Sequence, residues 1–185
     1  MRSLDEQLLR LARTRWHSPG AERIVVSFSR IGEHGAVWLA IGAIGQSVDP
    51  SRRPAWRRAR RTVLAVYALN TAIKLIVRRP RPCLEGLPPL AGAPSGLSFP
   101  SAHASTSFAG ARCYARLGLP GLPLYALATS LALSRLYLGL HNPSDVLAGA
   151  LLGASVSWGW GCTPARRDRE RGCTRTRHGG ERSQR

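Results

Sequence analysis

Long stretches without charged residues are the feature of this sequence that most restricts its fold. Four runs carry at most one charge: Gly35 to Val48, Thr62 to Val77 (with Lys74 alone), Leu117 to Ser134, and Val146 to Ala165. A fifth stretch, Ala102 to Leu117, is apolar or small apart from His103, Arg112 and Arg116. A helix that crosses the hydrocarbon core of a bilayer needs about 20 mostly apolar residues, with about 17 as a lower limit. Two runs meet this length, and the others approach it if flanking side chains extend toward water.

Five such segments predict an all-α fold, a polytopic membrane helical bundle of about five transmembrane helices. The alternative is a soluble protein with buried core helices, which the runs of 14 and 16 residues would permit. Five apolar segments, however, leave too few polar faces to cover a soluble globule.

The net charge of the chain is +17, which suggests binding to nucleic acid or to an anionic membrane surface. Its mean hydropathy of −0.13 is typical of a soluble protein. The basic residues nevertheless lie apart from the apolar runs: six arginines occupy residues 52–61, two lie at 112–116, and eight lie in 163–185. Arginine-rich loops face the cytoplasm. We therefore expect a multi-pass protein of the cell membrane whose segments 78–100 and 141–145 lie on the outer face. Five spans also place the N-terminus on the outer side, although the six arginines that precede residue 31 favour the cytoplasmic side.

The two ends of the chain differ from its apolar middle. Residues 1–30 have amphipathic spacing, with Leu4, Leu8, Leu9 and Leu11, and are predicted to form an N-terminal amphipathic segment on the membrane surface. Residues 31–162 form the transmembrane domain, and residues 163–185 are predicted to be a disordered basic tail that binds anionic lipid headgroups and no nucleic acid. No Cys/His spacing typical of a metal or redox site occurs, so neither a metal nor a cofactor is expected. The oligomeric state stays open.

Polar residues at the ends of the apolar segments are the candidates for function, because ionisable groups inside a bilayer are costly. With the topology above, they converge on the outer face from four helix ends: Lys74, Arg81, Ser101, His103, Arg135, His141 and Asp145. Pro100 and Ser101 are typical of a helix start, and a helix N-terminus favours phosphate. Asn142-Pro143 also begins a helix, with Asp145 at its third position and His141 just before it. A carboxylate so placed can orient the imidazole, as a nucleophilic histidine requires.

Three motifs formed by these residues resemble the type 2 phosphatidic acid phosphatase family, which shares its site with the vanadium haloperoxidases. The first is Lys74, six residues, then Arg81-Pro82. The second is Pro100-Ser101-Ala102-His103, where the family has glycine in place of Ala102. The third is Ser134-Arg135, five residues, His141, three residues, then Asp145.

The resemblance implies a metal-independent phosphatase that works through a phosphohistidine. His141 would attack phosphorus, Asp145 would orient it, and His103 would protonate the leaving oxygen and later activate water. Lys74, Arg81 and Arg135, with the Ser101 hydroxyl and the Ala102 N–H, would bind the phosphoryl oxygens. The methyl group of Ala102 would crowd the approach of the backbone to phosphate.

A site at the rim of a bilayer predicts a membrane lipid as substrate. The resemblance favours a prenyl-linked phosphate or diphosphate, of the decaprenylphosphoryl-phosphoribose or undecaprenyl-diphosphate type in cell-wall precursor synthesis. Phosphatidic acid and phosphatidylglycerophosphate are the alternatives. A haloperoxidase would be expected in a larger, soluble chain, and a non-enzymatic membrane protein would tolerate the loss of His141.

Overall fold

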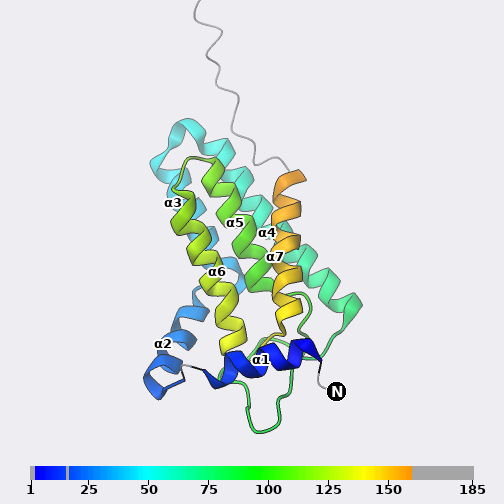
Figure 1. Cartoon of the computed structure of the whole chain (residues 1–185). Helices are drawn as coiled ribbons and strands as arrows, with labels where there is room; N and C mark the ends of the chain where they lie inside the picture. Colours follow the sequence, from blue (N-terminus) through cyan, green and yellow to red (C-terminus); the bar gives the residue numbers. More distant parts are fainter. Residues whose placement is uncertain (1–2, 16, 160–185) are drawn as a thin grey trace, which may run out of the picture.

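The computed structural model describes residues 3–15 and 17–159, and all of the regular structure in these residues is helical (Figure 1). The helices are α1 (Leu4–Thr14), α2 (Pro19–Arg30), α3 (Ala36–Val48), α4 (Arg53–Val77), α5 (Ala102–Arg116), α6 (Gly121–Tyr137) and α7 (Pro143–Gly159), with the 3-10 turns η1 (Glu33–Gly35) and η2 (Pro50–Arg52). The prediction of an all-α fold is therefore confirmed for this part of the chain. The expected basic tail, residues 163–185, lies outside the described residues.

As far as the described residues extend, each of the five apolar segments lies in one helix, but the boundaries shift. The largest difference is in α4, which begins at Arg53 and runs for 25 residues, or about 37 Å. The uncharged run that predicts this helix begins only at Thr62, because arginines occupy positions 57, 58, 60 and 61. Arginine is nonetheless a good helix former, so the basic segment continues the apolar helix.

Helix α5 lies at the centre of the bundle and contacts α4, α6 and α7 (Figure 1). Its approach to α7 is closest at Gly149 and Gly153, where an added methyl group would collide with the carbonyl oxygens of Ser101 and Ser105. Small residues spaced by four on one helix face permit such a close approach of two helices. The crossing aligns the beginnings of α5 and α7 at the same end of the bundle.

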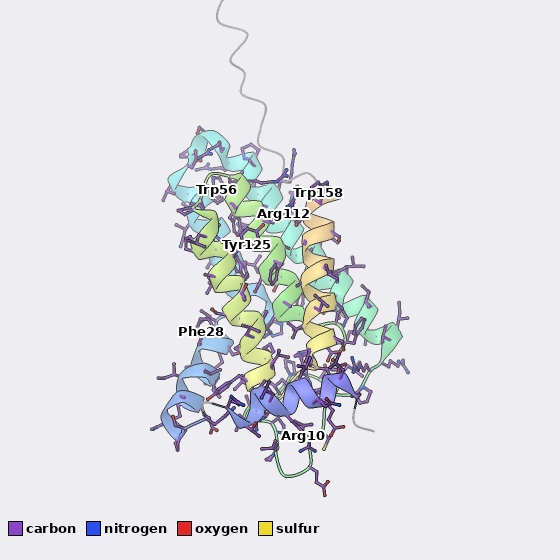
Figure 2. All side chains as sticks on the ribbon, viewed as in Figure 1. Arg10, Phe28, Trp56, Arg112, Tyr125 and Trp158 are labelled. Atoms are coloured by element: carbon purple, nitrogen blue, oxygen red, sulfur yellow. The ribbon has the colours of Figure 1, made fainter. Side chains whose placement is uncertain are left out.

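The arginine-rich turns lie at the opposite end of the bundle. Arg52 donates to the carbonyl of Leu117 (2.9 Å), so the turn before α4 meets the turn after α5. Close by, the guanidinium of Arg112 stacks 4.3 Å from the ring centroid of Trp158 near the end of α7 (Figure 2). The chain thus has one strongly basic end and, at its other end, the beginnings of α5 and α7.

The N-terminal helices extend the bundle at the end where α5 and α7 begin. Helix α1 lies across this end, roughly perpendicular to α6 and α7 (Figure 1), and Arg13 ties it there by donating to the carbonyls of Tyr137 and Pro88. Within the described residues, no helix taken alone has the length and apolar content of a membrane span. The segments Pro19–Arg30 and Glu33–Val48 meet those criteria together, as a pair bent by 43°.

Candidate active site

The three sequence motifs meet around one cavity at the end of the bundle that α1 crosses. The backbone N–H of Ser101 donates to the carbonyl of Asp145 (2.9 Å), which joins the start of α5 directly to the start of α7. The cavity has a volume of about 200 Å³. Six of the predicted site residues line it: Lys74, Arg81, Ala102, His103, Arg135 and His141. Ser101 and Asp145 lie immediately behind this wall, and both are fully buried.

Three cations from three elements face the cavity. Lys74 on α4 donates to the carbonyl of Leu97 (3.1 Å), and Arg81 in the following loop donates through Nε to the carbonyl of Ser95 (2.7 Å). Arg135 on α6 is 4% exposed. Protein carbonyls thus hold Lys74 and Arg81, and no described carboxylate forms an ion pair with either of these groups or with Arg135. The arrangement is suited to a multiply charged anion such as a phosphoryl group.

Besides Nδ1 of His141, two buried donors beside the cavity have no hydrogen-bond partner among the described residues. One is Nε of Arg135 and the other is the hydroxyl of Ser101. Ser101 occupies the N-cap position of α5, as predicted, but its side chain makes no capping bond. A buried donor without a partner is destabilising unless a ligand satisfies it. The two groups therefore provide free donors at the place where the sequence predicts a phosphate.

The hydrogen bonds of His141 define which of its ring nitrogens is available. Nη1 of Arg81 lies 3.2 Å from Nε2 of His141. Because a guanidinium only donates, Nε2 must be the acceptor and the ring proton must lie on Nδ1. Burial lowers the pKa of His141 to about 4, and the nearby carboxylate of Asp145 opposes this only in part. At neutral pH the imidazole is thus uncharged, with a lone pair on Nε2, the form that a nucleophile needs.

The carboxylate of Asp145 is close to His141 but is held mainly by other groups. Its Oδ2 lies 3.8 Å from Nδ1 of His141, too far for a hydrogen bond. The same oxygen accepts from the backbone N–H of Asn142 (2.8 Å), and Oδ1 accepts from Nη1 of Arg79 (2.8 Å). The sequence predicted direct orientation of His141 by Asp145. The structure places the pair in electrostatic contact, with a gap that the ring must close to form a hydrogen bond.

His103, on the first turn of α5, is held by a residue of α2. Its Nε2 lies 3.0 Å from the carbonyl of Ser29. A carbonyl only accepts, so Nε2 carries the proton and Nδ1 is the ring nitrogen left for proton transfer. The hydroxyl of Ser29 accepts from Nη1 of Arg135 (2.8 Å) and from the hydroxyl of Ser134 (3.1 Å). One serine thus holds both the candidate acid–base group and a candidate phosphate ligand.

The motifs do not contain Ser29, Arg79 or Asn70, although all three contact motif residues or the loop before α5. Asn70 is fully buried on α4 and donates to the carbonyl of Pro100 (3.3 Å), which fixes the loop that leads to Ser101. Its signal in the sequence was a polar amide one helical turn before Lys74. Ser29 and Arg79 lie among other serines and arginines, and no spacing distinguishes them.

Another part of the cavity wall is also polar. It is formed by Glu33 and His34 of η1, with Tyr67 and Thr71 of α4. Nδ1 of His34 lies 2.7 Å from the hydroxyl of Tyr67. His34 has a positive φ of 52°, an unusual backbone conformation that turns the chain between α2 and α3. These groups can bind hydroxyls that lie next to a bound phosphate.

Comparison with known proteins gives the following relatives. The family model of the PAP2 superfamily matches residues 61–169. The chain is 40% identical over 139 residues to decaprenylphosphoryl-5-phosphoribose phosphatase of Mycobacterium tuberculosis, covering 75% of this chain and 77% of the relative. The fold is similar to that of LpxE from Aquifex aeolicus, with a TM-score of 0.73, 24% identity, and coverage of 86% and 95% of the two chains. It is also similar to a transmembrane PAP2-type phosphatidylglycerolphosphate phosphatase from Bacillus subtilis, with a TM-score of 0.68, 22% identity, and coverage of 84% and 82%.

Proposed function

The chain belongs to the PAP2 superfamily, and from this premise we propose that it removes the terminal phosphate of a prenyl-linked sugar phosphate through a phosphohistidine on His141. That the enzyme is a lipid phosphatase is supported by the relatives named above, which are phosphatases of phosphorylated lipids. The observation that carries the mechanism is the convergence of two histidines and three cations on one cavity that has buried, unpartnered donors.

In the first step, Nε2 of His141 attacks phosphorus. The bond between phosphorus and the leaving ester oxygen breaks. The negative charge of the bound phosphate favours the protonated form of His103, which gives its Nδ1 proton to that oxygen. Arg81 donates to the same Nε2 in the structure (3.2 Å). A bound phosphoryl oxygen offers this guanidinium a stronger, charged acceptor, so phosphate binding would free the lone pair of His141.

In the second step, water attacks the phosphohistidine and the P–N bond breaks. His103, neutral after the first step, accepts a proton from that water. Inorganic phosphate leaves, and both histidines regain their initial states. Acid–base assistance of this kind typically contributes about 10²- to 10⁴-fold in rate. Lys74, Arg81 and Arg135 offset the charge that develops on the phosphoryl oxygens in both steps.

Two observations favour a sugar phosphate over a simple glycerolipid phosphate. The cavity wall beside the phosphate ligands carries the hydrogen-bonding groups of Glu33, His34 and Tyr67, which suit the hydroxyls of a sugar. The relative at 40% identity is named for decaprenylphosphoryl-5-phosphoribose. We therefore place a 5-phosphorylated pentose on a polyprenyl carrier first among the substrates.

For the membrane arrangement we propose five spans, with α2 and α3 together forming the first, and the site at the outer face. The arginine-rich turns at the other end of the bundle support this orientation. Helix α1 would then lie at the outer interface, with its exposed side chains Leu4, Leu8 and Leu11 toward lipid. The described residues contain an exposed free thiol at Cys83, on the side of the site. A membrane-impermeant maleimide added to whole cells should label Cys83 and spare a Ser51→Cys variant made in a Cys83→Ser background. The reverse pattern contradicts the outer site.

The substrate is tested with detergent-purified protein in EDTA. Phosphate release is measured from decaprenylphosphoryl-5-phosphoribose, undecaprenyl diphosphate, phosphatidylglycerophosphate and phosphatidic acid. We expect the highest kcat/KM for the prenyl-linked sugar phosphate, unaffected by EDTA. A preference for either glycerolipid refutes the substrate proposal, and equal release by wild type and His141→Ala refutes the enzymatic one. Dependence on a metal ion refutes the metal-independent mechanism.

A further inference from the structure

The carboxylate of Asp5, on the first turn of α1, reaches the start of α7. Its Oδ1 accepts from the backbone N–H of Ser144 (3.0 Å), and its Oδ2 accepts from the hydroxyl of the same serine. Ser144 lies in the first turn of α7, where backbone N–H groups lack partners within the helix. Asp5 thus caps α7 from another helix. Hydrogen bonds from Ser144 and Arg79 lower the pKa of Asp5 despite its partial burial, which acts in the opposite direction.

Arg79 joins Asp5 to the active-site carboxylate. Its Nη2 donates to Oδ2 of Asp5 (2.9 Å), while its Nη1 donates to Oδ1 of Asp145 (2.8 Å). Nη1 also donates to the hydroxyl of Ser144 (2.7 Å). Asp145 is completely buried, whereas the side chains of Arg79 and Asp5 are 33% and 22% exposed. The guanidinium therefore bridges a carboxylate at the surface and a carboxylate beside His141.

We propose that Asp5 is a positioning residue: it fixes the guanidinium of Arg79 in the orientation that holds Asp145 beside His141. Asp145 must stay close to Nδ1 of His141 while the ring changes from neutral to phosphorylated. With Asp5 present, Arg79 is held from both sides and its two terminal nitrogens have separate acceptors. Without it, a partly exposed arginine can adopt other rotamers, and Asp145 loses a fixed partner.

The inference extends the active site to a part of the chain outside the family match. Residues 61–169 match the family model, and Asp5 precedes them by more than fifty residues. Helix α1 would then have two roles. Arg13 anchors it to the bundle through the carbonyls of Tyr137 and Pro88, and Asp5 completes the support of the nucleophile. The inference rests on the proposed role of His141.

The test compares Asp5→Asn with Glu6→Gln as a matched control. Each change removes one carboxylate from the first turn of α1, but Glu6 pairs with Arg10 on its own helix (3.1 Å). Asparagine is itself a good capping residue, so Asp5→Asn keeps an acceptor for Ser144 and removes mainly the charge that holds Arg79. We expect Asp5→Asn to lower kcat about tenfold with KM within about twofold, and Glu6→Gln to change neither by more than about twofold. Thermal unfolding in detergent verifies that all variants are folded.

A double-mutant cycle with Arg79→Gln separates positioning from a general structural role. If Asp5 acts through Arg79, adding Asp5→Asn to Arg79→Gln lowers kcat by less than about twofold further, because contacting residues that act as a unit are not additive. Arg79→Lys keeps the charge but lacks the planar fork, so it should lower kcat about as much as Arg79→Gln does. An equal loss from Asp5→Asn in both backgrounds overturns the inference, as does a loss no greater than that of Glu6→Gln. A His141→Ala variant with wild-type activity refutes the proposed function itself, and the inference with it.

Discussion

Replacing Ser29 with alanine removes the hydroxyl on which Arg135 depends and leaves the carbonyl that holds His103. The hydroxyl accepts a 2.8 Å hydrogen bond from Nη1 of Arg135, and Ser29 is 1% exposed, so water does not replace it. Ser134, the other donor to this oxygen, keeps its bond to the carbonyl of Leu131 (2.8 Å). The loss is therefore essentially one hydrogen bond to a buried charged group, which is worth about 1.5–3 kcal/mol.

If Arg135 holds the phosphoryl group in the transition state, this loss converts to a fall in kcat/KM of about 10- to 150-fold. The matched control is Ser27→Ala, the same change on an exposed residue of α2, which should leave kcat/KM within about twofold. The assay is phosphate release from the preferred lipid over a range of pH. Because the carbonyl of residue 29 remains, Ser29→Ala should lower the whole pH profile without shifting it along the pH axis. Equal kcat/KM for Ser29→Ala and Ser27→Ala would refute the role of Ser29, and a shifted profile would mean that His103 has been disturbed.

Three further predictions concern the crossing of α5 and α7, the second motif and His141. Gly153→Ala places a methyl group against the carbonyl of Ser105 and should destabilise the protein by about 1–3 kcal/mol in thermal unfolding. Gly159→Ala should not, because the added methyl group would meet no described tertiary neighbour within 4 Å. Ala102→Gly should raise kcat/KM by about two- to fivefold and lower the melting temperature slightly, because glycine lets the backbone approach phosphate but is a poorer helix former. The folded-state pKa of His141 is lowered from 6.5 to about 4, so its contribution to stability is complete above pH 6.5 and is lost as the pH falls toward 4. The melting temperature of His141→Gln should therefore fall less steeply over this range than that of wild type, and equal slopes would contradict the buried neutral imidazole.

The sequence was sufficient to place the motif residues at one end of the bundle. Lys74, His103 and His141 each lie at the end of an apolar segment, and helices that alternate in direction bring every second end to the same face. The close packing at Gly149 and Gly153 is a second feature visible in the sequence, because small residues spaced by four lie on one helix face.

The supporting residues could not be predicted, because their roles depend on tertiary contacts. Ser29 and Ser27 are separated by two positions on the same helix, and only the docking of α2 on α6 buries one and exposes the other. Arg79 lies in a run of basic residues, and its direction is set where α4 ends at Val77 and the next residue, Arg78, adopts a φ of 52°. Asp5 is an acidic residue in the first turn of an amphipathic helix. The helix dipole alone explains an acidic residue at that place, so nothing in the sequence indicates that its carboxylate contacts another helix.

The proposed reaction passes through a phosphohistidine at His141. The most direct test is to mix enzyme and preferred lipid, quench the mixture in alkali during a single turnover, and map the phosphate on the protein by mass spectrometry. We predict a phosphoryl group on His141 that is stable to alkali and labile to acid, and that is absent in His141→Ala, whose kcat falls by about 10⁴-fold or more. A phosphate on another residue, or turnover by His141→Ala at the wild-type rate, would contradict the phosphohistidine mechanism.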